Sequence, residues 1–327
     1  MKKTILILTS IFLVVSLFVS CNDGEEGLFQ MAANSVKKES FKILGIINRG
    51  ESENTYIVAT DNGIAKYDTS AKAFSEFNGT GVTAKNSVWA SADGSEYIYF
   101  DSSSDSYKDK SGEKVEIVGL DGLTPQPFYT SNGNEFTYVF KNAANEHYTL
   151  YTPTSLSKDE FINIRPNKIY IEGKTVDSVS IIGNGILRVH CSDKSYYLYD
   201  SVNGNYINTD SLIINGIADD GLCITNEGKM YYFGESTISP IDVPDSSPIS
   251  KRPAIFSTNY EGNKYSYFIP EGSSSVIELK GEGVNVTKTT KTVTGLQNIT
   301  VIAIIDKRGN NLVVLTANSG VQELELK

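Results

Sequence analysis

The stretch that decides the fold is "IINGIADDGLCITNEGKMYYFGESTISPID", residues 213–242. It contains four short runs of apolar and β-branched residues, separated by turns rich in Gly, Asn, Asp and Glu. Runs of this kind favour β-strands, and polar Gly turns between them favour antiparallel hairpins. The stretch therefore predicts a small sheet of four consecutive strands.

The same unit recurs along the chain. Seven apolar runs each end in a polar turn with a glycine, about 43 residues apart on average. These turn glycines are Gly50, Gly94, Gly133, Gly185, Gly221, Gly262 and Gly309. Four-strand units repeated at this period are typical of β-propeller blades. We therefore predict an all-β, seven-bladed β-propeller over residues 41–327, with six or eight blades as the alternatives.

Some units depart from the pattern. In the second unit, "DSSSDSYKDKSG" stands where a turn and the third strand belong, and "KVEIV" (114–118) is expected as the fourth strand. In the third unit the expected fourth strand is "EFINI" (160–164). The seventh unit stops at Lys327 after its third run, so residues 27–38 are a candidate for the missing outer strand. A short amphipathic helix packed on the ring is the alternative for that segment.

Two hairpins carry a family resemblance. The stretches "GIAKYDTSAKAFSEF" (63–77) and "YYLYDSVNGNYIN" (196–208) resemble PQQ-like or WD40-like propeller hairpins, in which a strand ends in Asp and a turn leads to an aromatic residue. The resemblance implies the propeller fold. The tryptophans of quinone-binding repeats are missing, since Trp89 is the only tryptophan, so no quinone site and no other cofactor is expected.

The first residues have the features of a targeting signal. Lys2 and Lys3 precede an apolar run that ends at Ser20 and Cys21, which is the layout of a secretory signal too short to span a bilayer as a helix. The stretch resembles the lipobox of bacterial lipoproteins. That resemblance implies cleavage before Cys21, acylation of this residue with diacylglycerol and a further acyl chain such as palmitate, and stable anchoring in a membrane. We thus expect a signal peptide over 1–20 and a lipidated tether over 21–40.

Charge limits the partners and the location. Without Lys2 and Lys3, 27 basic residues stand against 39 acidic ones, so the mature chain carries a net charge of −12. A chain this acidic, without a basic run, has no electrostatic footprint for nucleic acid. It would also be repelled by anionic membrane surfaces, so the lipid must hold it there. Asn22 after the cysteine favours the outer membrane of the cell envelope.

Few residues point to chemistry. His147 is expected to be solvated and His190 to be packed in a strand, and two histidines are too few for a zinc site. Cys191 and Cys223 lie on equivalent strands of neighbouring units, facing the same way, which disfavours a disulfide. "DSSSDSYKD" (101–109) has oxygen side chains at alternate positions but fails the EF-hand pattern, so an exposed hairpin loop is favoured over a calcium site. We expect no metal.

These observations favour a lipid-anchored, monomeric propeller that binds a protein or another macromolecule and does not catalyse a reaction. The alternative is a propeller hydrolase or lyase acting on glycans, for which Arg188 would be a channel-mouth residue to check. Binding residues concentrate on loops held by a rigid scaffold, and the blade-joining segments 119–127, 165–175, 243–253 and 288–298 are the long ones. Their positive residues would orient an acidic partner. The predicted partner-binding residues are Arg165, Lys168, Tyr170, Lys251 and Arg252.

Overall fold

The computed structural model describes residues 42–49, 55–61, 63–68, 70–71, 73–78, 87–126, 129–131, 135–153, 156–183, 185–234, 237–242 and 248–327. Residues Lys42–Lys327 form one compact unit. The signal peptide, Cys21 and the candidate ring-closing segment 27–38 lie outside the described residues, so those expectations stay predictions.

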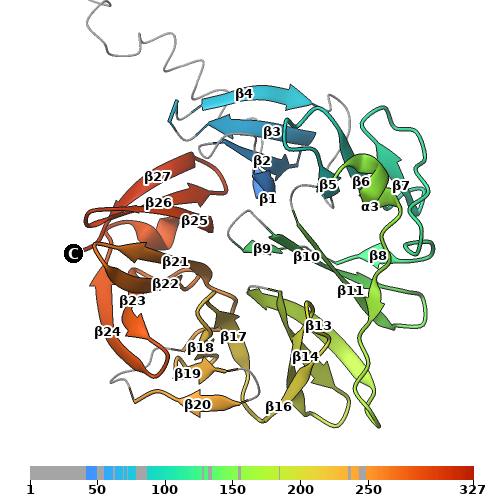
Figure 1. The fold of residues 1–327 in the computed structure, drawn as a ribbon. Coiled ribbons are helices and arrows are strands. Elements are labelled where there is room, and N and C mark those ends of the chain that lie inside the picture. Colours follow the sequence, from blue (N-terminus) through green and yellow to red (C-terminus); the bar gives the residue numbers. More distant parts are fainter. Residues whose placement is uncertain are drawn as a thin grey trace, which may run out of the picture. The chain divides into compact units, whose positions relative to one another are not determined.

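Seven antiparallel sheets follow one another along this unit and are arranged around a ring (Figure 1). First strands of most neighbouring sheets contact each other, and the last sheet contacts the first. This arrangement confirms the seven-bladed β-propeller. We number the sheets as blades 1 to 7 in chain order.

Four blades have four strands in consecutive order. Blade 1 consists of β1 (Ile43–Arg49), β2 (Thr55–Thr60), β3 (Gly63–Asp68) and β4 (Ala73–Asn78). Blade 4 consists of β13 (Val176–Gly183), β14 (Ile186–Cys191), β15 (Tyr196–Asp200) and β16 (Tyr206–Asp210). Blade 5 consists of β17 (Ile214–Ile217), β18 (Leu222–Thr225), β19 (Met230–Phe233) and β20 (Ile238–Pro240). Blade 6 consists of β21 (Ala254–Tyr260), β22 (Asn263–Ile269), β23 (Ser275–Glu282) and β24 (Asn285–Thr292), followed by the 3-10 turn η1 (Leu296–Asn298).

The other three blades depart from this plan. Blade 2 has β5 (Ser87–Ala90), β6 (Tyr97–Asp101) and β7 (Ser106–Asp109). Blade 3 has a first strand in two pieces, β8 (Thr124–Pro125) and β9 (Tyr129–Ser131), then β10 (Glu135–Lys141), β11 (His147–Pro153) and β12 (Asn167–Lys168), with helix α3 (Lys158–Ile162) before β12. Blade 7 has β25 (Val301–Arg308), β26 (Asn311–Thr316) and β27 (Gly320–Glu325).

The apolar core lies between the blades. Every residue of β2 and of β18 is buried, because both faces of a blade are covered by its neighbours. Ile57 of blade 1, for example, belongs to the same cluster as Tyr97 of blade 2. Burying an aliphatic or aromatic side chain contributes about 1.5–3 kcal/mol, so these seams between blades hold the ring together.

Closure of the ring joins blade 7 to blade 1. The Ile43 amide donates to the Ala317 carbonyl at 2.9 Å. Gly320 lies against the rings of Tyr67 and Phe74, whose centroids are 4.7 Å apart in an edge-to-face pair. Contacts between the beginning and the end of the unit thus complete the ring.

Blade 3 corrects two expectations. Residues 160–162 of the predicted strand "EFINI" instead belong to helix α3, because Ser157 and Glu160 form a capping box. The Ser157 hydroxyl accepts from the Glu160 amide, and the Glu160 carboxylate accepts from the Ser157 amide at 2.8 Å. The outer strand β12 lies inside the segment 165–175, which we had expected to be only a linker.

Blade 2 corrects a third expectation. Its third strand β7 does lie inside "DSSSDSYKDKSG", but the predicted fourth strand "KVEIV" is not formed. A single bridge between Lys108 and Lys114 is all that remains of that pairing. Two other expected linkers also contain strand residues, since β8 lies in 119–127 and the end of β24 in 288–298.

Candidate functional site

Strand direction divides the loops between two faces of the ring. The turns between second and third strands share one face with the blade-joining segments, and we call it the linker face. The opposite face, here the turn face, carries the turns between first and second strands. In those turns, positive φ angles of 57° to 84° are found at Gly94, Gly185, Gly221, Gly262 and Gly309, which confirms them as turn glycines. Gly50 and Gly133 lie outside the described residues.

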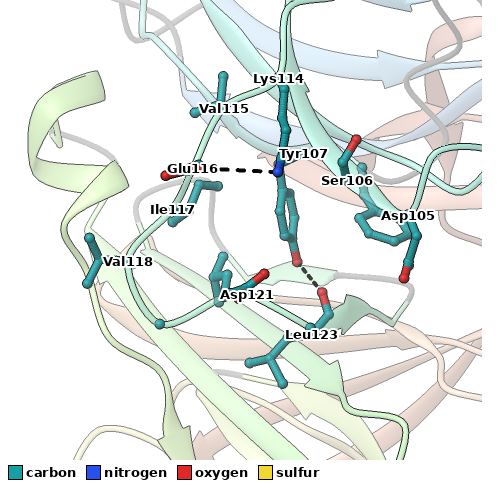
Figure 2. A pocket seen from close by; sticks show the side chains of 14 residues that line it. Asp105, Ser106, Tyr107, Lys114, Val115, Glu116, Ile117, Val118, Asp121 and Leu123 are labelled. Atoms are coloured by element: carbon teal, nitrogen blue, oxygen red, sulfur yellow. Dashed lines mark hydrogen bonds and ion pairs between the residues drawn. The ribbon is translucent and has the colours of Figure 1, made fainter.

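Three cavities are lined by linker-face segments of the described chain. The blade 2 cavity, of about 360 Å³, lies between β7 and residues 114–123 (Figure 2). An open groove of about 450 Å³, the blade 2–3 groove, lies between residues 119–123 and the β10–β11 turn. A smaller cavity of about 110 Å³ lies between blades 6 and 7 and is lined by Arg252.

Two consecutive β-turns separate the blade 2 cavity from the groove. The Leu120 amide donates to the Ile117 carbonyl, and the Leu123 amide to the Leu120 carbonyl, both at 3.0 Å. Gly119 and Gly122 stand third in these turns with φ of 83° and 69°, as type II turns require. The three anchoring residues are buried, so the turns form a wall with a fixed backbone.

Blade 3 holds this wall in place. The Val118 amide donates to the Ile162 carbonyl at the end of α3, at 2.8 Å. Gly119 packs against the chain that follows the helix: a Cβ on this glycine would lie 3.2 Å from Pro166 Cδ and 3.6 Å from Arg165 Cα. One of the predicted partner-binding residues therefore stands directly beside the wall.

Inside the blade 2 cavity, the buried Tyr107 hydroxyl donates to the Leu123 carbonyl at 2.7 Å (Figure 2). Burial raises the pKa of this phenol, so it remains a neutral donor at physiological pH. At the rim, the Lys114 ammonium lies 4.0 Å from the Glu116 carboxylate. Both side chains are exposed, so the ion pair contributes little to stability.

Two further carboxylates line the blade 2 cavity without an ion-pair partner in the described part of the chain. The exposed side chains of Asp105 and Asp121 have no ion pair or hydrogen bond to the described residues. Nearby Asp101 differs, because its carboxylate pairs with the Lys108 ammonium at 2.7 Å and its pKa is lowered by that contact. The cavity thus carries uncompensated negative charge.

The rim of the blade 2–3 groove is a hydrogen-bonded cluster. The Lys168 ammonium pairs with the Glu146 carboxylate, which also accepts from Asn142 Nδ2 at 2.8 Å and the Tyr148 hydroxyl at 3.1 Å. These contacts, the one to Lys168 first, hold the pKa of Glu146 below its usual range. The cluster fixes the β10–β11 turn against β12.

The predicted partner-binding residues fall into two groups on the linker face. Arg165, Lys168 and Tyr170 lie in and around β12, and Tyr170 is 63% exposed. Lys251 and Arg252 precede blade 6, where the exposed Lys251 pairs with Glu271 at 2.9 Å. The structure does not bring the two groups together, and their role in binding stays a prediction.

The positive charges differ from what the sequence suggested. Lys168 and Lys251 are each paired with a carboxylate of this chain, so their charges are largely satisfied internally. The blade 2 cavity itself was missed. Its signals are the tandem turn "IVGLDGL" (117–123), with apolar residues three apart and a glycine third in each turn, and the Ser-x-x-Glu capping box of α3.

The histidines give one correction. His147, expected to be solvated, is buried, with Nε2 3.4 Å from the Asp177 carbonyl of the next blade, and burial lowers its pKa. His190 is half-buried against the ring of Tyr196, at 4.7 Å between centroids. In the described part of the chain, no three His, Cys, Asp or Glu residues gather as metal ligands, and no helix is long and apolar enough to cross a membrane.

Other residues that we had considered for function lie in contacts within the fold or in its core. Asp101 accepts hydrogen bonds from the hydroxyls of Ser103 and Ser104 in an exposed turn. The Arg188 guanidinium, considered for a channel mouth, instead reaches blade 5, where it donates to Asn215 Oδ1 and, at 3.2 Å, to the Ile214 carbonyl. Cys191 and Cys223 are buried free thiols.

Comparison with known proteins yields distant structural similarities only. No family model and no curated protein sequence matches the chain. Among solved structures, it is similar to the N-terminal domain of Nup159 (12% identity, TM-score 0.44, covering 89% of this chain and 92% of that one). It is also similar to YCF48 from Cyanidioschyzon merolae (12%, 0.44, covering 87% and 95%) and to BamB from Moraxella catarrhalis (11%, 0.40, covering 86% and 85%). The propeller assignment rests on the strand pairing described above.

Proposed function

We propose that this protein is a lipid-anchored propeller of the bacterial cell envelope that binds a protein partner through its linker face. The binding site is centred on the seam of blades 2 and 3. The lipobox-like sequence ending at Cys21 supports the anchor, and the outer membrane is the proposed location.

One observation carries the binding site. At this seam, a cavity and an open groove share a wall of two fixed turns. The exposed Val118 lines the cavity, Arg165 packs against Gly119 of the wall, and the exposed Tyr170 lies in the same outer segment of blade 3 as Arg165. Tyrosine and arginine are the residues that most often dominate binding energy at protein interfaces. Because the backbone of the wall is fixed, little conformational entropy is lost when a protein ligand binds to it.

The anchor is tested by Cys21→Ser in the native host. The chain should move from the membrane fraction to the soluble fraction, and it should lose incorporation of a labelled palmitate analogue. Ser20→Ala is the control, because a small residue before the cysteine is retained. The lipid anchor would be refuted if the wild-type chain in the membrane fraction did not incorporate the labelled palmitate analogue and Cys21→Ser did not change the fraction in which the chain is found.

The binding site is tested by crosslinking and affinity capture from native envelopes. The test variant combines Arg165→Glu with Tyr170→Ala. The matched control on the turn face combines Arg308→Glu with Tyr206→Ala, which changes the same residue types at exposed positions. Thermal melts check that both variants fold.

We expect wild type and the turn-face control to recover the same envelope protein and the Arg165/Tyr170 variant to lose it. A second variant, Lys251→Glu with Arg252→Glu, asks whether the other group contributes. Loss on the turn face with retention in both linker-face variants would show that the face is wrongly assigned.

A further inference from the structure

Blade 2 contains a gap where an outer strand would lie. Pairing along the outer side of β7 consists of two hydrogen bonds, from the Asp109 amide to the Glu113 carbonyl (3.0 Å) and from the Val115 amide to the Tyr107 carbonyl (2.9 Å). The chain after Val115 leaves β7, because the Val118 amide is held by the Ile162 carbonyl of α3. The blade 2 cavity is the space that this departure opens.

The gap leaves a strand edge facing the cavity. The N–H and C=O groups of one strand residue point to the same side of the strand. Since the Tyr107 carbonyl points outward to Val115, the Tyr107 amide also points outward, and it has no hydrogen-bond acceptor among the described residues. An added strand could supply that acceptor, as in other cases where a peptide extends a sheet.

The walls of the gap select the added segment. Val115, Val118 and Leu123 provide an apolar lining for a short aliphatic side chain. The unpaired carboxylates of Asp105 and Asp121 lie on the same cavity (Figure 2). On a chain with a net charge of −10, they favour a basic group and repel an acidic one.

We propose that the blade 2 cavity binds an extended peptide segment of a partner protein, with aliphatic side chains flanking a lysine or arginine. A backbone carbonyl of the segment accepts a hydrogen bond from the Tyr107 amide, and the cation of the segment lies between Asp105 and Asp121. This inference rests on the proposed function, because it names the part of the partner that the linker face recognises.

The test uses the full chain in detergent and a fluorescein-labelled, end-blocked five-residue peptide of alternating threonine and valine with a central lysine. Binding is measured by fluorescence anisotropy. Matched peptides carry glutamine or glutamate at the centre. The protein variants are Asp105→Asn/Asp121→Asn, which changes two exposed side chains without changing their shape, and the control Asp242→Asn, an exposed aspartate at the end of blade 5.

We expect the lysine peptide to bind more tightly than the glutamine peptide, and the glutamate peptide not to bind. The double variant should weaken the lysine peptide about three- to tenfold, as expected for two exposed ion pairs, and Asp242→Asn should not. Raising the salt concentration should weaken binding in the wild type and much less in the double variant.

Equal affinity for the three peptides, or equal affinity of the double variant, would overturn the inference. Peptide binding that appears only when residues 22–38 are deleted would also overturn it, since the cavity would then bind the chain's own tether. The same holds if sedimentation shows that the peptide displaces a second copy of the chain. These outcomes leave the capture result for Arg165 and Tyr170 unaffected, so failure of this inference and failure of the proposed function are distinguishable.

Discussion

Gly119 and Gly122 hold equivalent places in two consecutive turns, yet their surroundings differ. Both have positive φ, which disfavours any residue with a Cβ. A Cβ at position 122 would meet nothing within 4 Å, whereas one at position 119 would meet Pro166 and Arg165. The sequence alone indicates the two turns, but it does not reveal which one is packed against another blade.

We therefore expect Gly119→Ala to destabilise the protein more than Gly122→Ala. Gly122→Ala should cost about 1–2 kcal/mol from backbone strain alone. Gly119→Ala should cost more, because the 3.2 Å approach to Pro166 must also be relieved. Urea unfolding gives the two free energies, and equal losses would show that the wall is not held by blade 3.

The buried His147 predicts that the stability of the protein depends on pH. Its pKa in the folded chain is lowered, first by burial, and the charge of Lys141 acts in the same direction. Below about pH 6.5 the unfolded chain binds a proton that the folded chain does not. The free energy of unfolding should thus fall as pH decreases from 6.5 toward the lowered pKa.

The measurement is the urea midpoint between pH 7.5 and 5.5, in wild type and in His147→Gln. The slope should be smaller in the variant. Carboxylates contribute only at lower pH, since Asp93 for example has its pKa lowered to about 2 by hydrogen bonds from Ser91 and Ser95. An identical slope in both proteins would mean that His147 titrates normally.

At the scale of elements, the chain's own polar and apolar pattern predicts most strands and the five described glycines of the turns between first and second strands. It fails where a local signal competes with that pattern. "EFINI" alternates like a strand, but the capping box of Ser157 and Glu160 satisfies the first amides of a helix instead. The helix then binds Val118 and prevents the outer strand of blade 2. One unrecognised cap thus explains both errors.

A link between elements also gives a prediction. Arg188 of β14 reaches Asn215 of β17, and Asn215 in turn donates to the Ile249 carbonyl. Asn215→Ala leaves a mostly buried guanidinium without its side-chain acceptor and should cost about 3 kcal/mol or more. Arg188→Met keeps the apolar stem, removes the charge, and should cost less.

Thermal melts with matched urea curves compare these two variants. The free energy of unfolding of the double variant should lie closer to that of Arg188→Met than to that of Asn215→Ala. The reason is that the cost of the unpaired charge disappears with the arginine. Two independent, additive losses would contradict this account of the seam between blades 4 and 5.

For the whole molecule, the number of blades follows from the repeat, because each unit can bury its faces only against a neighbour. The details of closure do not follow from the repeat. Gly320 and the Tyr67–Phe74 pair meet only because the first and last blades come together. No short-range pattern in the sequence marks such a contact between residues so far apart in the chain.

Closure can be weakened selectively. Tyr67→Ala removes a buried ring from the seam of blades 1 and 7 and should cost about 3–5 kcal/mol. Hydrogen exchange should then accelerate at the Ile43 amide, which bonds to Ala317 across that seam, before it does so at Val189 in blade 4. Uniform acceleration in every blade would indicate that the ring opens as one unit.

The single tryptophan gives the molecule an internal optical reporter. Trp89 is 6% exposed, and its indole stacks on Phe161 of α3 with ring centroids 6.1 Å apart. Trp89 lies in β5 of blade 2, so its emission reports on the place where α3 packs against that blade. Detachment of α3 would shift the tryptophan emission to the red, so the state of this one seam can be followed in the unlabelled protein.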